Sequence, residues 1–307
     1  QLIYIEIYNE LVSQYKFNKE EISQIIKGLI NKIDVTIYAK PEFSWEQMFE
    51  IRLGLEAGVD VNIYLNPEFE ARKMEQIRLG LEHDIDVSIY ANSKFENGQM
   101  AEIRVGLEKN LEVSKYAKVE FNWFQMNHIR SGLEKGLDVS WYASPEFNRV
   151  QMDEIRTGLE QGLDVSIYAD PEFNWFQMRQ IKFGLMSKVD VSIYAKPEYD
   201  WKQMNEIRLG LLEKNLDVSI YSSLEFEAEQ MWQIREGLEK GLDVSAYAKP
   251  EFDFRQMEQI KLGLENGIDV SSYLNPGIEW KEMGKIRLEL QGNKEIGRIK
   301  LELQGNK

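Results

Sequence analysis

A unit of 26 residues recurs through most of this chain. It is clearest in the segment FNRVQMDEIRTGLEQGLDVSIYADPE, which begins at Phe147, and it returns from about Phe17 to Gly284. A unit this short cannot bury its apolar residues alone, so neighbouring units must stack and share a continuous core. The repeat therefore predicts the architecture before any other feature is considered, and it points to no particular chemistry.

Each unit contains the start signals of a long helix. Ser44 occupies an N-cap position and Gln47 follows three residues later, which is the spacing of a capping box. Phe43 and Met48 flank this start at the spacing of a hydrophobic staple. The same cap pair recurs at Asn122/Gln125, Asn148/Gln151, Asn174/Gln177, Asp200/Gln203 and Asp253/Gln256.

The long helix has one apolar stripe and a defined end. Met48, Ile51 and Leu55 have the three-and-four spacing of a single helix face. Gly58 follows, and a residue there can adopt the left-handed conformation of a Schellman-type end while Val59 packs back. The equivalent residues elsewhere are Gly136, Gly162, Gly241 and Gly267, with Asn110 and Asn215 as variants.

A second, shorter helix follows at once. Asp60 is placed to cap the segment Val61 to Tyr64, and Pro67 ends it because the residue before a proline is disfavoured in helical geometry. The available length allows one or two turns, α-helical or 3₁₀. The corresponding caps are Asp34, Asp60, Asp86, Glu112, Asp138, Asp164, Asp190, Asp217, Asp243 and Asp269.

A glycine within every long helix is unexpected, because Gly costs about 1 kcal/mol relative to Ala in a helix interior. We predict that it lets the neighbouring helix, with its arginine, approach closely. These glycines are Gly28, Gly54, Gly80, Gly106, Gly132, Gly158, Gly184, Gly210, Gly237 and Gly263.

These patterns predict an all-α fold, an αα-type solenoid or superhelix of about ten 26-residue repeats. Residues 1–16 depart from the unit and are expected to form an N-terminal cap, 17–284 the helical repeat solenoid, and 285–307 a C-terminal cap or tail. The tail contains a near-duplication, IRLELQGNK and IKLELQGNK. It is compatible with a capping helix pair or with a small hairpin that turns at Gly292 and Asn293.

The string DVSxYAxPEFxxxQMxxIRxGLExGL, which covers about Ile33 to Gly277, resembles short tandem-repeat arrays in large proteins of Gram-positive anaerobes and their mobile elements. The resemblance implies an interaction module.

The charge balance argues against several partner classes. The chain has 52 acidic and 37 basic residues, a net charge of −15, which disfavours direct binding to nucleic acid and to anionic membranes. There is no cysteine, no apolar run long enough to span a bilayer, and no signal peptide pattern. We expect an intracellular location. The chain begins at Gln1, which suits a fragment or a processed form.

Two ladders of side chains have structural and functional interpretations. Ten methionines share one repeat position, and their staple spacing predicts core packing rather than soft-metal binding. A basic ladder could grip a polyanion, but glutamates four residues later on the same face favour internal pairing. Its members are Arg52, Arg78, Arg104, Arg130, Arg156, Lys182, Arg208, Arg235, Lys261 and Arg287.

Aromatic residues at the first two helical positions are the candidate partner-binding site. They vary between units, as a partner-reading surface would, although local packing over the turn is the simpler interpretation. The candidates are Trp45, Trp123, Phe124, Trp175, Phe176, Trp201 and Trp280, together with Trp141 on a short helix.

No pattern indicates catalysis, a metal or a cofactor. His83 and His128 fall at unrelated repeat positions without a ligand-spaced Cys or second His, and no phosphate loop or nucleophile motif occurs. The sequence thus predicts a non-enzymatic protein-binding scaffold of unknown partner and oligomeric state. The alternative is an acidic mimic of nucleic acid, since duplex DNA carries one charge per ~1.7 Å, which would inhibit a DNA- or RNA-handling protein such as a host defence enzyme.

Overall fold

The computed structural model describes residues 2–213 and 216–305, and every regular element in these ranges is helical. The all-α fold class is therefore confirmed. From α2 to α11, long helices of 12 or 13 residues alternate with three-residue 3₁₀ helices at the period of the repeat, as a helical repeat solenoid requires. Of the two forms considered for the short helix, the 3₁₀ form is the one observed.

The long helices are α1 (Leu2–Gln14), α2 (Lys19–Ile30), α3 (Trp45–Ala57), α4 (Ala71–Glu82), α5 (Asn97–Glu108), α6 (Trp123–Glu134), α7 (Arg149–Glu160), α8 (Trp175–Met186), α9 (Trp201–Leu212), α10 (Ala228–Glu239), α11 (Phe254–Glu265) and α12 (Trp280–Gly305). The 3₁₀ helices are η1 (Val35–Ile37), η2 (Val61–Ile63), η3 (Val87–Ile89), η4 (Val113–Lys115), η5 (Val139–Trp141), η6 (Val165–Ile167), η7 (Val191–Ile193), η8 (Val218–Ile220) and η9 (Val244–Ala246).

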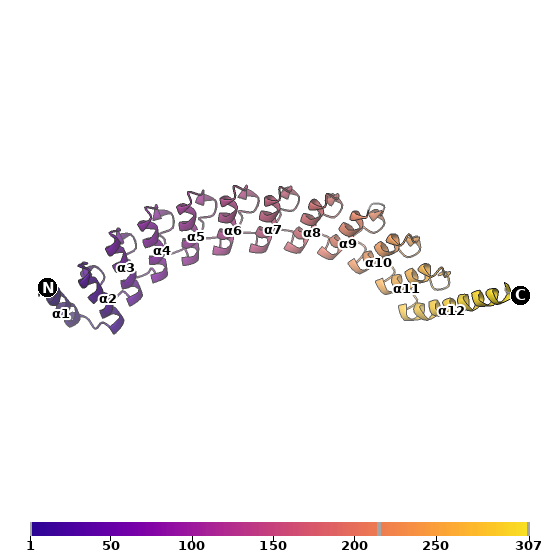
Figure 1. The fold of residues 1–307 in the computed structure, drawn as a ribbon, viewed down its shortest axis with the longest axis horizontal. Coiled ribbons are helices and arrows are strands. Elements are labelled where there is room, and N and C mark those ends of the chain that lie inside the picture. Colours follow the sequence, from indigo (N-terminus) through magenta and orange to yellow (C-terminus); the bar gives the residue numbers. More distant parts are fainter. Residues whose placement is uncertain (1, 214–215, 306–307) are drawn as a thin grey trace. The chain divides into compact units, whose positions relative to one another are not determined.

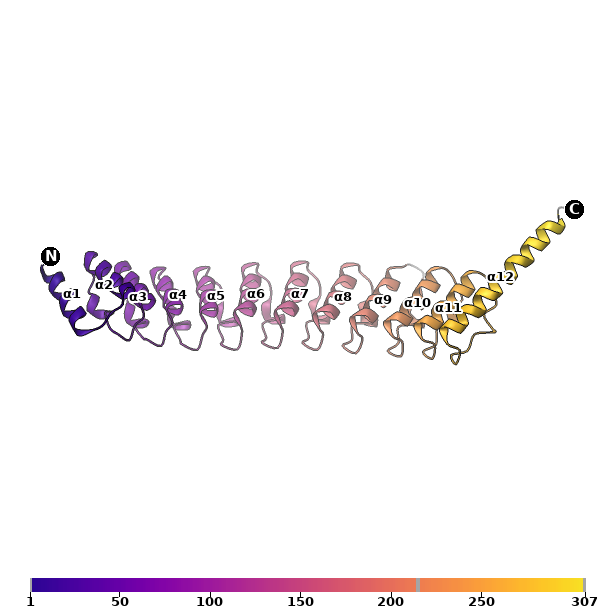
Figure 2. The ribbon, with the colours of Figure 1, turned by 90° about the horizontal axis from the view of Figure 1, so that it is seen from below.

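The chain divides into two compact units, Gln1–Arg156 and Thr157–Lys307, with the boundary inside α7. In the first unit each helix from α1 to α6 contacts the next one, and in the second unit the same holds from α8 to α12. Within each unit the long helices therefore follow one another side by side in chain order (Figures 1 and 2). This is the stacking that the repeat predicted.

The predicted capping boxes are all present, and their glutamine has a further role. The Gln125 side chain accepts a hydrogen bond from the Asn122 N–H at 2.9 Å. Its amide nitrogen donates to the carbonyl oxygens of Pro145 at 3.2 Å and Phe147 at 2.7 Å, in the loop that leads to the next long helix. One side chain thus caps its own helix and holds the neighbouring unit, a function that the spacing alone did not reveal.

The predicted helix ends are confirmed in the described residues. Gly58 has a φ of +75° and Asn110 a φ of +54°, and the Val59 N–H closes back on the Gly54 carbonyl at 3.0 Å. Lys32, Asp84 and Lys188 also adopt positive φ, although no glycine or asparagine predicted it there. Asn215 lies outside the described residues.

The aspartate caps of the short helices are confirmed with one exception. The Asp60 carboxylate accepts from the Asn62 N–H at 3.1 Å, and Asp138 accepts from both the N–H and the hydroxyl of Ser140. Glu112, which we also predicted as a cap, makes no such bond to the backbone. Its additional methylene places the carboxylate too far out for the i+2 bond.

The expected role of the helix glycine was wrong. A Cβ built on Gly54 would lie 1.9 Å from the Tyr64 hydroxyl and 3.0 Å from the Val61 side chain, both in the 3₁₀ segment of the same unit. The hydroxyl occupies the space that glycine leaves and donates to the Glu50 carbonyl oxygen at 3.3 Å. The glycine therefore admits a tyrosine of its own unit rather than the arginine of a neighbour.

The core is built from one set of side chains that recurs in every unit. In the unit around α4 these are Val61, Tyr64, Phe69, Met74 and Ile77, all at most 6 % exposed. All ten in-register methionines are fully buried, which confirms their predicted core position. Leu55, which we counted in the apolar stripe, is only half-buried, and the tyrosine that we left out is fully buried instead.

The two ends differ from the repeats. Most of the segment that we expected to cap the N-terminus forms the helix α1, which contacts α2. At the other end, neither a helix pair nor a hairpin forms, because α12 runs without a break from Trp280 to Gly305. Its C-terminal half extends beyond α11 (Figures 1 and 2) and leaves Ile296 and Leu301 exposed.

Because the Tyr116 hydroxyl occupies the space beside Gly106, we expect Gly106→Ala to destabilise the protein, although Ala favours helix. The new Cβ would lie 1.9 Å from the Tyr116 hydroxyl, and such overpacking costs about 1–3 kcal/mol in the free energy of unfolding. Adding Tyr116→Phe should recover part of the loss. Gly297→Ala, where nothing lies within 4 Å, is the control and should stabilise slightly. Urea unfolding measures all three variants, and equal effects at Gly106 and Gly297 would show that the Tyr116 hydroxyl does not need the space beside Gly106.

The same tyrosines predict unfolding at alkaline pH. Burial raises the pKa of Tyr90 and Tyr116 well above the ordinary value, and that of Tyr273 to about 12. Their stabilising contribution is complete below pH ~10 and declines as the pH rises further, by about 1.4 kcal/mol per pH unit for each group that ionises only when unfolded. We expect tyrosinate absorbance and loss of helical circular dichroism to rise together. Ionisation of all tyrosines near pH ~10 with unchanged helix content would show that the hydroxyls are not buried.

Candidate functional site

We define the variable face as the side chains at the first, second and fifth positions of the long helices α3 to α12. The first and fifth positions lie one turn apart on the same side of a helix. On α3 the face consists of Trp45, Glu46 and Phe49, and on α4 of Ala71, Arg72 and Glu75. Unlike the recurring core set, these residues change in size and charge from one helix to the next.

In the first unit, the aromatic candidates of the variable face lie in two places. The rings of Trp123 and Phe124 stack at 3.6 Å at the start of α6, and the Arg149 guanidinium lies 5.2 Å from the Phe124 ring. Trp45, at the start of α3, is 39 % exposed and makes no ring or cation contact within the described residues. Trp123 and Phe124 therefore contact other side chains of the chain and Trp45 does not, although all three residues are about equally exposed.

In the second unit, three of the predicted residues come together. Trp175 and Phe176 stack at 3.4 Å on α8, and Phe176 contacts Trp201 of α9 at 5.2 Å. Trp280 lies farther along, where the Arg255 guanidinium is 5.5 Å from its ring. The structure thus joins Trp175, Phe176 and Trp201 into one cluster and places Trp280 under a cation.

Trp141 is separate from the variable face. It is the last residue of η5, is 42 % exposed, and makes no ring contact within the described part of the chain. The same repeat position holds the exposed side chains of Ile63, Ile89 and Ile220. Its repeat position groups Trp141 with an apolar row on the 3₁₀ helices rather than with the long-helix aromatics.

Sequence reasoning missed part of the variable face. Phe49 and Trp232 hold the fifth helical position, one turn after the first, and Trp232 is 41 % exposed. The cations that cover aromatic rings were also missed, such as Arg179, whose guanidinium lies 4.7 Å from the Trp175 ring. The i to i+4 spacing could have identified both, because residues one turn apart share a helix face.

The basic ladder is committed to internal contacts where the structure describes its partners. The predicted i to i+4 pairs form at Arg52–Glu56, Arg78–Glu82, Arg104–Glu108, Arg130–Glu134 and Arg235–Glu239. A second contact, which was not predicted, links each arginine to the preceding helix. Arg104 donates to the Gln76 side chain at 3.1 Å, and Arg130 to Glu102 at 2.7 Å. These arginines join neighbouring helices and do not form an open row of cations.

Three of these joints contain a carboxylate that is at most 14 % exposed, at Glu50, Glu102 and Glu206. Glu50 accepts from Arg78 at 2.8 Å, and each side chain is 10 % exposed. Burial raises the pKa of the Glu50 carboxyl even though the adjacent guanidinium lowers it, whereas Glu50 and Glu82 hold the pKa of Arg78 above its ordinary value despite burial. The equivalent joint in the second unit is Glu206–Arg235 at 2.9 Å.

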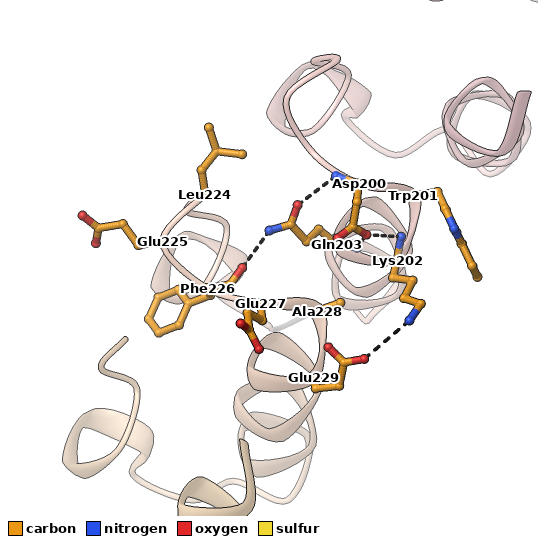
Figure 3. A pocket seen from close by; sticks show the side chains of 10 residues that line it. All are labelled: Asp200, Trp201, Lys202, Gln203, Leu224, Glu225, Phe226, Glu227, Ala228 and Glu229. Carbon is orange, nitrogen blue, oxygen red and sulfur yellow. Dashed lines mark hydrogen bonds and ion pairs between the residues drawn. The ribbon is translucent and has the colours of Figure 1, made fainter. Parts of the chain in front are cut away.

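Three pockets open beside the variable face. One of about 330 Å³ lies between α3 and α4 and is lined by Trp45, Phe49 and Ala71 among others. Two pockets of the second unit, of about 380 and 260 Å³, share Trp201 and Ala228. Figure 3 shows the pocket of about 380 Å³, where Gln203 bridges the start of α9 to the Phe226 carbonyl and Lys202 pairs with Glu229 at 3.6 Å.

No group of three or more His, Cys, Asp or Glu side chains that could hold a metal occurs among residues 2–213 and 216–305. His83 contacts Glu108 at 2.8 Å, and burial lowers the pKa of His128 despite the nearby Asp153. In the three pockets described above, Glu50 pairs with Arg78 and Lys202 pairs with Glu229.

Three comparisons with known proteins add no assignment, since no family model, no curated protein and no solved structure matches this chain. In the described residues, no helix combines the length and apolar character needed to cross a membrane.

The buried joints predict an asymmetric response to mutation. Arg78→Ala leaves the Glu50 carboxylate buried without its guanidinium and should cost about 2–3 kcal/mol in the free energy of unfolding. Glu50→Gln should cost less than about 1 kcal/mol, because a glutamine oxygen can accept the guanidinium hydrogen bond, as Gln76 does from Arg104. Hydrogen exchange of the α3 and α4 amides measures both. Equal losses would show that the pair acts through charge rather than through hydrogen bonding.

Proposed function

We propose that this chain is a non-enzymatic protein-binding scaffold that presents the variable face to a protein partner. The supporting observation is that the core and joint residues recur from unit to unit, whereas exposed aromatic and charged side chains change at fixed places on the helices. A rigid support with changeable side chains is the usual arrangement of repeat proteins that bind partners.

The chemistry of the face favours a protein partner. Tryptophan, phenylalanine and arginine are enriched at protein interfaces, where a few of them supply most of the binding energy. Trp123 and Phe124 are 40 % and 38 % exposed although they stack on each other, so their outer surfaces stay available. The net charge of −15 disfavours nucleic acid as the ligand of the same face.

The alternative is an acidic mimic of nucleic acid that occupies a DNA- or RNA-handling protein. Its support is the net charge and the exposed carboxylates that recur once per unit at the aspartate caps, such as Asp86, Asp190 and Asp243. Each of these already accepts hydrogen bonds from the serine two residues later, which lowers its pKa. The caps therefore have a structural role that needs no partner.

Affinity capture with the intact chain tests the proposal. A variant with Trp45, Trp123, Trp175 and Trp201 changed to alanine should lose the partner that the unchanged protein retains, since anchor residues are each worth about 2 kcal/mol or more. The matched control changes Ile63, Ile89 and Ile220, which have similar exposure on the 3₁₀ helices, and should keep the partner.

Salt separates the two functions. Capture through aromatic anchors should persist at about 0.5 M salt, where the Debye length is only a few ångströms, whereas an acidic mimic should release its partner. Capture that survives the tryptophan changes but not the salt would reject the variable face as the binding site and support the mimic.

A further inference from the structure

The pocket between α3 and α4 is an aromatic and acidic slot, which we call the Ala71 slot. Its lining consists of Trp45, Glu46, Phe49, Glu50, Ala71, Arg72 and Glu75, and its volume is about 330 Å³. That volume is large enough for the end of one long side chain. Ala71 makes the space, because the first position of the other long helices more often carries a large residue.

The charge of the slot is complementary to a cation. Three of the lining residues are carboxylates and one is a guanidinium. Glu50 is committed to Arg78, and Glu46 accepts from the Ser44 hydroxyl at 2.8 Å. Glu75 is half-buried and makes no hydrogen bond or ion pair within the described residues, so its charge is available to a ligand.

The chain itself shows what such a slot binds. Arg149 holds on α7 the repeat position that Ala71 holds on α4, and its guanidinium lies over Phe124 of the preceding helix. Phe124 is the second residue of its helix, whereas the ring beside Ala71, Trp45, is the first residue of α3. In the first unit, α7 thus places an arginine over a ring of the preceding helix, while α4, with Ala71 at the same position, leaves Trp45 without a ring or cation contact within the described residues.

Other aromatic residues of the variable face have a cation of their own. Arg255 lies 5.5 Å from the Trp280 ring, and Lys261 lies 5.6 Å from the Trp232 ring. The corresponding pocket between α9 and α10 contains the ion pair of Lys202 with Glu229. Trp45 at the Ala71 slot therefore lacks the cation that these rings have.

We propose that the Ala71 slot receives an arginine side chain from a basic segment of the partner protein, with the guanidinium stacked on Trp45 and its charge facing Glu75. A guanidinium suits the site because it is planar, weakly hydrated and able to stack on an aromatic face while it donates to a carboxylate. This assignment rests on the proposed scaffold function and adds the chemical class of the partner segment.

The test measures binding of a fluorescent tetra-arginine peptide to the full chain. Ala71→Arg should weaken binding about tenfold, because an arginine at this position can reach over the preceding helix, as Arg149 does, and fill the slot, and Trp45→Ala should weaken it by a similar factor. The control Asn97→Arg adds the same charge at the same helical position of α5, where the preceding helix offers Ala71 instead of a tryptophan, and should change binding less than about twofold.

Two further measurements define the site. Arg72→Gln should strengthen binding, because it removes the only guanidinium among the lining residues. A tetra-lysine peptide of the same charge should bind more weakly, since an ammonium group stacks less well than a guanidinium. Circular dichroism confirms that each variant keeps its helix content.

The proposal is overturned if Ala71→Arg weakens binding no more than Asn97→Arg does. It is also overturned if tetra-lysine binds as tightly as tetra-arginine and its affinity is unchanged by Trp45→Ala. Either result indicates general attraction to an acidic protein. If the peptide fails while partner capture still depends on the variable-face tryptophans, only the arginine assignment is wrong. If capture does not depend on those tryptophans, the scaffold function itself is wrong, whatever the peptide does.

Discussion

The hydroxyl of one tyrosine, set into the notch of one glycine, determines the shape of each unit. Tyr116 reaches across to the long helix and donates to the Glu102 carbonyl at 3.1 Å, and Gly106 leaves the room for it. This contact holds the 3₁₀ helix against the α-helix with a fully buried side chain. The glycine lowers helix propensity, and the tyrosine buries a polar hydroxyl group. Each residue is therefore favourable only when the other is present.

Polar side chains then join one unit to the next. The capping glutamine donates hydrogen bonds to two carbonyl groups of the following loop. The arginine of the basic ladder donates to a carboxylate or amide oxygen of the preceding helix. The first and second helical positions have no part in these contacts, whereas some fifth-position residues do, such as Asn127, which donates to Glu102, and Asn205, which accepts from Arg208. The first and second positions, which form most of the proposed binding face, can therefore change without disturbing these joints.

Much of the fold could be predicted from the chain alone because its determinants are local. The capping boxes at Ser44 and Asn122, the left-handed residue at Gly58 and the buried methionines all depend on spacings of a few residues. The predictions failed where the partner lies farther along the chain. The spacing within a helix showed that Gly54 is unusual, but it could not show that Tyr64 fills the space.

The candidate site divides in the same way. The sequence by itself determined a helical repeat, its period, the core position of its methionines and the presence of variable aromatics such as Trp45 and Trp201. Only the tertiary structure decided that Trp141 stands apart, that Arg149 covers Phe124, and that Ala71 leaves a slot open. The reason is that periodicity specifies which face of a helix a side chain occupies, whereas the contact it makes there depends on the size and charge of a residue one unit away.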